Sequence, residues 1–181
     1  MSNKKKVQKN IAIGQETKYV DNEVIEKYVS GDIVMHNCLE QIKDILKNEH
    51  CSNKEYSLFK NELALNLDNV EIAIKKGTPY REPTVDFVVG LENSQLLLTE
   101  AKYLVDKMEN IAIDIDKKIK HSKDLLTSNP NFGSIYKKKI ILLNSKNFEQ
   151  KRRRLMNLLN NDVSYYPSTS IEFYSKFFEK P

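Results

Sequence analysis

The sequence has no tryptophan and contains only two cysteines, five glycines and five prolines among its 181 residues. The few glycines and prolines exclude collagen-like and other low-complexity chains, in which these residues dominate the composition. Two cysteines are too few for a disulfide-based scaffold, which indicates a reducing compartment. We therefore expect a soluble protein that works in the cytoplasm.

Long hydrophobic runs are also missing. No apolar stretch approaches the roughly 18 residues that a membrane-spanning helix needs, and no apolar segment of a signal peptide follows the lysine-rich N-terminus. Apolar residues nevertheless make up 40% of the chain, which suffices for a hydrophobic core and excludes a disordered protein. The expected organisation is a flexible basic segment over residues 1–20 and a single domain over residues 21–181.

Arginine is scarce for a chain with 29 basic residues and a formal net charge of +4. Only Arg81, Arg152, Arg153 and Arg154 are present, and three of them are consecutive. Because a guanidinium group matches the geometry of a phosphate, we interpret the triplet as a candidate nucleic-acid contact. A solvated helix face is the alternative. The mildly basic charge is compatible with nucleic acid without being diagnostic of it.

Four residues of the types that bind zinc occur close together, His36, Cys38, His50 and Cys51. Their spacing is unfavourable, because two of them are adjacent and no Cys-x-x-Cys pair precedes them. We therefore expect these side chains to have a structural role.

Hydrophobic periodicity predicts helices where apolar residues recur every three or four positions, and strands where they alternate or run continuously. The expected helices span residues 32–48, 54–67, 108–126 and 148–160. The expected strands span residues 70–75, 84–89, 95–103, 139–143 and 170–174. This order favours an α/β (α+β) fold in which a central mixed sheet is covered by helices on both faces.

The second and third expected strands carry charges in apolar surroundings. Period-two alternation places Glu100 and Lys102 on the same strand face as two leucines, and Asp86 interrupts another apolar run. Buried charges cost several kcal/mol unless they are paired or bind a metal. A polar turn at residues 92–94 predicts that the two strands form a hairpin. The hairpin would bring Asp86 and Glu100 together.

Two carboxylates with an ammonium group beside them form an oxygen-rich site that suits Mg²⁺, with Mn²⁺ able to replace it. A metal ion held there polarises a phosphate and lowers the pKa of a bound water molecule. Lys102 would position this water, help to deprotonate it, or stabilise the charge of the transition state. The predicted chemistry is the hydrolysis of a phosphodiester bond.

These residues resemble the signature of the PD-(D/E)XK nuclease superfamily: Pro-Asp on one strand, then an acidic residue, any residue and Lys on the next. The second half reads Glu-Ala-Lys at residues 100–102. The first half is looser, because residues 83–86 read Pro-Thr-Val-Asp. The resemblance covers residues 54–145. It implies a restriction-endonuclease-like fold, a central mixed β-sheet flanked by helices, here with an extra N-terminal helix.

The resemblance also implies a further acidic metal ligand on a preceding helix. Glu62 is our first choice for this position, and Glu40 is the second. The implied catalytic set is then Asp86, Glu100 and Glu62 as metal ligands, with Lys102 beside the attacking water.

Several basic residues are candidates for binding nucleic acid. In relatives the helix after the catalytic lysine often carries auxiliary lysines, and the resemblance points here to Lys118 and Lys120. Arg81 precedes the motif closely enough to contact a phosphate near the scissile bond. The arginine triplet completes the candidate set.

The expected function is that of a Mg²⁺-dependent nuclease, a hydrolase acting on ester bonds, with DNA as the expected substrate. Endonuclease roles in restriction, repair, mobile-element processing and defence all fit, and a homodimer would allow both strands of a duplex to be cut. The first alternative is a non-catalytic nucleic-acid-binding or assembly protein with a nuclease-like fold. The second is an unrelated interaction domain in which Asp86, Glu100 and Lys102 form surface ion pairs.

Overall fold

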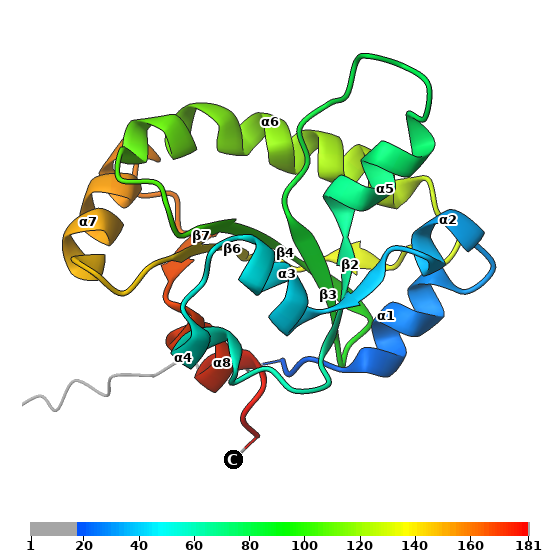
Figure 1. Ribbon diagram of the computed structural model, residues 1–181, viewed down its shortest axis with the longest axis horizontal. Coiled ribbons are helices and arrows are strands. Elements are labelled where there is room, and N and C mark those ends of the chain that lie inside the picture. The colour runs from blue at the N-terminus through cyan, green and yellow to red at the C-terminus, as the bar shows by residue number, and fades with distance from the viewer. Residues whose placement is uncertain (1–17, 181) are drawn as a thin grey trace, which may run out of the picture.

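The computed structural model describes residues 18–180. Its centre is a seven-stranded mixed β-sheet with helices on both faces (Figure 1), which confirms the expected layered α/β architecture. The segment expected over residues 1–20 lies outside the described residues except for its last three. Among these, Val20 forms an isolated bridge with Leu91 and donates a backbone hydrogen bond of 2.8 Å to Phe177.

The helices and strands alternate along the described chain. The helices are α1 (Asn22–Val29), α2 (Ile33–His36), α3 (Ile42–Asn48), α4 (Asn53–Tyr56), α5 (Leu67–Ile74), α6 (Met108–Thr127), α7 (Phe148–Leu158) and α8 (Ser170–Phe177). The strands are β1 (Leu39–Gln41), β2 (Leu63–Asn66), β3 (Phe87–Leu91), β4 (Gln95–Lys102), β5 (Ser134–Ile135), β6 (Lys139–Leu143) and β7 (Tyr165–Ser168). Between residues 18 and 180, no helix combines the length and the apolar character that crossing a membrane requires.

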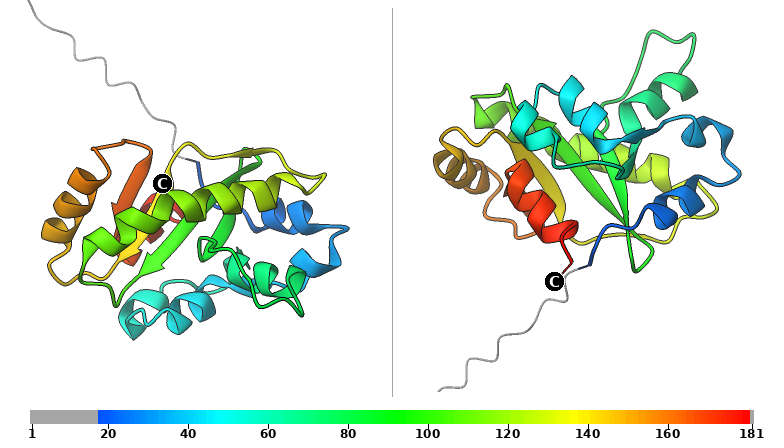
Figure 2. Two further views of the ribbon diagram at one scale, coloured as in Figure 1. Left: turned by 90° about the horizontal axis from the view of Figure 1, so that it is seen from above. Right: turned by 60° about the horizontal axis from the view of Figure 1, so that its bottom comes forward.

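The sheet has the strand order β1-β2-β3-β4-β6-β7, and the short β5 also pairs with β4. The pairs β1–β2, β2–β3 and β3–β4 are antiparallel, whereas the pairs β4–β6 and β6–β7 are parallel. Parallel neighbours need a crossover connection. Helix α6 supplies it between β4 and β6, and α7 supplies it between β6 and β7. Figure 2 shows α6 lying across one face of the sheet.

The core is divided between the two faces of the sheet. Helices α1, α2, α5, α6 and α7 contribute to one buried cluster, and α3, α4 and α8 pack on the other. Strand β4 serves both, because Leu96 and Leu98 join the first cluster while Leu97 joins the second. The alternation of side chains along a strand explains this division.

The second half of the chain follows the sequence expectations most closely. Strand β4, helix α6, strand β6 and helix α7 occur within two residues of the expected bounds. The expected hairpin is also present, with Phe87 opposite Thr99 and Leu91 opposite Gln95. Its first strand begins at residue 87 rather than 84.

Two expected helices in the first half of the chain are wrong. The helix expected over residues 32–48 is interrupted by β1, and most of that expected over residues 54–67 is replaced by a loop and β2. Strands β1 and β2 pair with each other, with Leu39 opposite Leu65. Pairing within the sheet therefore overrides a helical spacing of apolar residues, which is only a weak local preference.

Two expected strands are also wrong, because the segments form helices α5 and α8. Helix α5 begins where the Asn66 side chain accepts a hydrogen bond from the backbone N–H of Asn69. Helix α8 begins with a reciprocal capping box between Thr169 and Glu172. Alternation over about five residues does not distinguish a strand from a short helix, whereas these caps favour the helix.

The two cysteines lie in different parts of the core. Cys38 belongs to the cluster on one face of the sheet and Cys51 to the cluster on the other, and both are buried free thiols. The two side chains therefore do not share a site, in agreement with the structural role expected from their spacing.

Candidate active site

Asp86 and Glu100 come from the two strands of the β3–β4 hairpin. The ladder places Phe87 opposite Thr99, so Asp86 and Glu100 continue it by one step. The Asp86 carboxylate accepts a hydrogen bond of 2.5 Å from the backbone N–H of Ala101. The hairpin expected from the sequence therefore brings the two carboxylates together at one end of the sheet.

Two ammonium groups meet these carboxylates. Lys102 Nζ lies 2.6 Å from Glu100 Oε1 and 3.6 Å from Asp86 Oδ2. Lys118, which projects from α6, places its Nζ 2.6 Å from the same Glu100 oxygen and 3.9 Å from Asp86 Oδ1. We call Asp86, Glu100, Lys102 and Lys118, which are the candidate active-site residues, the catalytic cluster. The crossover helix thus supplies the second cation from a distant part of the chain.

Burial determines the electrostatics of the catalytic cluster. Glu100 is 2% exposed and Asp86 is 5% exposed. Burial, together with the charge of Glu100, raises the pKa of Asp86 to about 7, although both lysines oppose the shift. Burial disfavours the charged form of Lys102, but the two carboxylates outweigh it and raise the pKa of Lys102 above its ordinary value. Lys102 is therefore a hydrogen-bond donor and a fixed positive charge rather than a base.

The two oxygens of Glu100 differ. Oε1 contacts both lysines, whereas Oε2 is buried and has no hydrogen-bond partner among residues 18–180. A buried carboxylate oxygen without a partner is costly and therefore uncommon. Oε2 is an available electron-pair donor at the centre of the cluster.

A third carboxylate, that of Glu49 at the end of α3, was not expected from the sequence. A hollow of about 190 Å³ beside Asp86 is lined by Glu49 and Asp68, among other residues. Burial raises the pKa of Glu49, and the negative charge of Asp86 raises it further. Glu49 therefore faces the catalytic cluster across this hollow. No motif marks it in the sequence, because its position depends on how α3 packs on the sheet.

Glu62, the expected third ligand, does not join the catalytic cluster. It lies in the loop before β2 rather than on a helix, and its carboxylate accepts hydrogen bonds from the backbone N–H groups of Lys60 and Asn61. Asn66, at the other end of β2, pairs with Phe87 beside Asp86. Glu62 precedes Asn66 by four residues, which corresponds to roughly 13 Å along an extended strand. The expectation of a helix-borne ligand at residue 62 is corrected accordingly.

Glu40, the second choice, lies on the edge strand β1. Its carboxylate accepts hydrogen bonds from the side-chain amides of Asn66 (3.1 Å) and Asn69 (2.5 Å). These bonds connect β1 to the start of α5. Glu40 therefore has a structural role at this edge of the sheet.

The candidate phosphate contacts on α6 and before β3 are separated from one another. Lys118 belongs to the catalytic cluster, but Lys120 is exposed and lines a different hollow together with Asp116 and Lys139. Arg81 is exposed in the loop that leads from α5 to β3. Of these candidates, only Lys118 contacts the two buried carboxylates directly.

The arginine triplet on α7 is similarly divided. Arg152 lies over the ring of Tyr166, 5.9 Å from its centre, and Arg154 pairs with Glu109 at the start of α6. Arg153 is exposed. Arg152 and Arg154 therefore contact elements that neighbour α7, whereas the exposed Arg153 makes no such contact with residues 18–180.

A second group of polar and charged side chains is built around His121 on α6. His121 Nδ1 lies 2.8 Å from the Glu82 carboxylate, and Nε2 lies 3.1 Å from Glu71 Oε2. The backbone N–H of Glu82 donates to Glu71 Oε1 at 3.0 Å. We call these three residues the loop clamp, because they hold the segment between α5 and β3 against α6.

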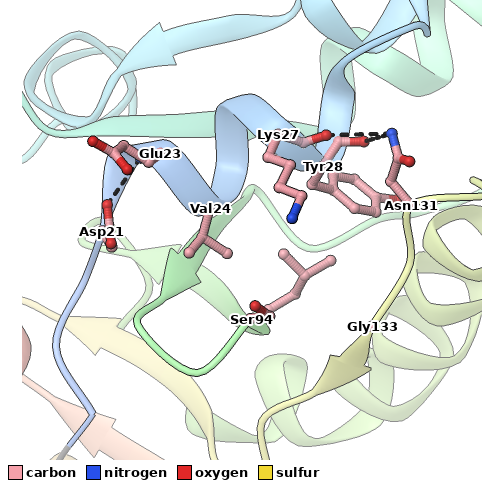
Figure 3. Close-up of a pocket in the computed structure, with 9 residues that line it drawn as sticks. Asp21, Glu23, Val24, Lys27, Tyr28, Ser94, Asn131 and Gly133 are labelled. Atoms are coloured by element: carbon pink, nitrogen blue, oxygen red, sulfur yellow. Dashed lines mark hydrogen bonds between the residues drawn. The ribbon is translucent and has the colours of Figure 1, made fainter.

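A further hollow, of about 260 Å³, lies at the opposite end of β4 (Figure 3). It is formed between α1, the β3–β4 turn and the segment before β5. The side-chain amide of Asn131 is bonded to the backbone carbonyls of Lys27, Tyr28 and Ser30. The hollow contains no member of the catalytic cluster, so we place the candidate active site elsewhere.

Across residues 18–180, no three His, Cys, Asp or Glu side chains are arranged as a ready metal-binding group. The charged groups nearest the two buried carboxylates are the two lysines.

Comparisons of the chain with protein-family models, with curated proteins and with solved structures found no match. The function is therefore argued from the geometry of the catalytic cluster.

Proposed function

We propose that this chain is a metal-dependent nuclease that hydrolyses phosphodiester bonds, with DNA as the expected substrate. The observation that carries the proposal is the buried pair Asp86–Glu100, in contact with the ammonium groups of Lys102 and Lys118. Burying the two carboxylates costs several kcal/mol per ion before they pair with the partly buried lysines. A perturbed carboxyl pKa beside a hollow is typical of a functional site.

The donor set fits Mg²⁺, with Mn²⁺ as a substitute. Both buried carboxylates offer oxygen, the atom that Mg²⁺ prefers, and Glu100 Oε2 has no partner in the described chain. Asp86 and Glu100 would hold the ion, and Glu49 faces them across the adjoining hollow. When bound, the ion supplies polarisation of a phosphate oxygen and a more acidic water molecule.

The residues of the chain would then divide the remaining work. Lys102, held as a cation by the two carboxylates, donates hydrogen bonds from Nζ to the attacking water and to the phosphate. Lys118 orients Glu100 through Oε1 and adds a second positive charge where negative charge develops. The backbone N–H of Ala101 fixes the direction of the Asp86 carboxylate. These are electrostatic and positioning roles, which matter most in water-poor surroundings.

The order of the elements supports the restriction-endonuclease-like part of the proposal. Strands β2, β3 and β4 form an antiparallel meander, and α6 then returns the chain to the parallel β6. Glu100 and Lys102 lie near the end of β4, and Asp86 lies one residue before β3. The chain departs from the signature in the spacing of Pro83 and Asp86, and in the position of the third carboxylate.

The test is a cleavage assay on supercoiled plasmid, linear duplex DNA, single-stranded DNA and RNA, each with Mg²⁺, Mn²⁺ or EDTA. We expect cleavage that needs the metal and is lost in Lys102→Ala. Lys117→Ala is the matched control, because Lys117 is an exposed lysine beside Lys118 on α6. It should cleave like the wild type.

Absence of cleavage on every substrate, in a folded protein, would overturn the proposal. If nucleic acid still bound, the non-catalytic binding protein would replace it. Cleavage that survives in Lys102→Ala would place the activity at another site or in a contaminant.

A further inference from the structure

A hollow of about 220 Å³ adjoins the catalytic cluster on the side of α6. Three of its lining residues, Glu100, Lys102 and Lys118, belong to the cluster. The others come from the first two turns of α6 and the segment before it: Val105, Asn110, Ile111, Asp114 and Ile115. The hollow and the reacting centre therefore share a wall.

The chemistry of this hollow differs from that of a groove for the phosphate backbone. Its inner wall is aliphatic, formed by Ile111 and Ile115, which are 4% and 2% exposed, and by the partly buried Val105. A backbone groove needs cations along its length. Here the Asp114 carboxylate, one turn before Lys118 on α6, also lines the hollow and would repel a second phosphate.

An aliphatic wall with polar groups at its margin fits a flat ring with hydrogen-bonding edges. The size is adequate, because a cavity of about 150 Å³ already admits benzene. Asn110 offers both donors and an acceptor, whereas Asp114 only accepts. A carboxylate that only accepts favours a base with an exocyclic amino group, as in the pairing of Asp or Glu with cytosine N4.

We propose that this hollow, the base pocket, binds the nucleobase of the nucleotide whose phosphate reaches Lys102 and Lys118. The proposal rests on the proposed nuclease function and adds a substrate class to it. A base in the pocket is out of the helical stack, so the substrate is single-stranded or has a base that leaves the stack easily. Bases with an exocyclic amino group, cytosine among them, bind better than thymine.

The first experiment measures binding without cleavage. Deoxycytidine monophosphate, thymidine monophosphate and inorganic phosphate are titrated into the full chain in EDTA, and the Kd of each is measured by calorimetry or NMR. We expect deoxycytidine monophosphate to bind about tenfold more tightly than phosphate, the effect of one good hydrogen-bonded contact. Asn110→Ala and Asp114→Asn should reduce this advantage to about threefold or less.

Asp124→Asn is the matched control, because it makes the same change at an exposed position ten residues further along α6. It should bind all three ligands like the wild type. Asn110 and Asp114 are themselves exposed, so their variants should keep the wild-type melting temperature. Equal binding of nucleotide and phosphate by the wild type, or an equal loss in Asp124→Asn, would overturn the base pocket.

The second experiment separates the base pocket from the nuclease. Single-stranded oligonucleotides carrying one abasic position are offered to the wild type and to Asn110→Ala. We expect one abasic position, next to the scissile phosphate, to lower kcat/KM of the wild type about tenfold and to have little effect on the variant. If no abasic position changed kcat/KM, the base pocket would be refuted while the proposed nuclease function remained supported. If nucleotides bound with the expected effects of the variants but no substrate was cleaved, the nuclease function would be refuted and the base pocket supported.

Discussion

Helix α6 supplies one basic side chain to each of two carboxylate pairs. Lys118 meets Asp86 and Glu100, and His121, one turn later, meets Glu71 and Glu82. Both groups consist of two acidic side chains held by one helix. They nevertheless differ in burial, in the satisfaction of their oxygens and in the direction of their pKa shifts.

The loop clamp is satisfied electrostatically. Burial acts to raise the pKa of Glu71, but the Glu82 backbone N–H and His121 outweigh it, so that the pKa is lowered. In the catalytic cluster, burial and the neighbouring carboxylate win, and the pKa of Asp86 is raised. A carboxylate whose pKa is lower in the folded state than in the unfolded chain stabilises the fold at neutral pH. One whose pKa is raised on folding reduces the stability at neutral pH. This difference separates a structural anchor from a site retained for another purpose.

The clamp also has a place in the architecture. It fixes the base of the segment that joins α5 to β3, which carries the exposed Tyr80 and Arg81. This segment stands clear of the sheet beside α5 (Figure 1) and then leads directly to Asp86. The clamp therefore positions a basic segment next to the catalytic cluster without belonging to it.

The largest expected effect is a difference in activity between variants of Lys118 and His121 on α6. Lys118→Ala removes a cation from the reacting centre and should lower kcat/KM by about 10²-fold or more, as the loss of a transition-state donor does elsewhere. His121→Ala changes only the loop clamp and should lower kcat/KM less than tenfold. The measurement is cleavage of one oligonucleotide under saturating metal. Equal losses of kcat/KM in the two variants would contradict the functional distinction between the catalytic cluster and the loop clamp.

A second contrast lies in the pH dependence of stability. The pKa of Asp86 is about 7 in the folded state and about 3.9 in the unfolded chain. Between these two pH values Asp86 keeps its proton in the folded state but loses it in the unfolded chain. The contribution of Asp86 to the free energy of unfolding is therefore most favourable at pH 4 and is lost as the pH rises through 7. Asp86→Asn should therefore be more stable than the wild type by a few kcal/mol at pH 8 and much closer to it at pH 5.

Glu71→Gln should show the opposite sign. A lowered folded pKa contributes stability above the unfolded value near 4.3, and this is lost as the pH falls through the folded pKa. The variant should therefore be less stable than the wild type at pH 8, by roughly 1.5 kcal/mol, the lower end of the range for a hydrogen bond to a charged group. Urea unfolding in EDTA at pH 5 and pH 8 measures both variants. The same sign at Asp86 and Glu71 would refute the comparison.

The catalytic cluster illustrates how much of a site a sequence can predict. The convergence of Asp86, Glu100 and Lys102 depends on one hairpin, and its alternation and turn are local features of about twenty residues. Glu49 could not be found in this way, because it reaches Asp86 only through the packing of α3. Glu62 was chosen on a helix that does not form, so its placement failed with that helix.

The fold shows the same dependence on range. The continuous apolar run of β6 and the long periodicity of α6 were predicted well, because each is strong within one element. The expectation of a strand in place of helix α5 depends on Val70, Ile72 and Ile74 at alternate positions, yet Ile72 and Ile74 are exposed, 41% and 49%. The cap of α5, Asn66, was the available local signal. Pairing of β1 with β2 joins segments far apart and had no such signal.

The smallest expected effect concerns Arg81, at the end of the segment that the clamp holds. If its exposed guanidinium contacts a phosphate, Arg81→Ala should weaken binding of DNA of any sequence to a similar extent and reduce the slope of log K against log salt by about 1. Lys54→Ala is the control, because Lys54 is exposed on α4, which packs on the other face of the sheet. Filter binding between 50 and 200 mM salt gives both slopes. An unchanged slope in Arg81→Ala would show that nucleic acid does not contact Arg81 in the segment held by the loop clamp. The position of this segment beside Asp86 would then have a structural reason only.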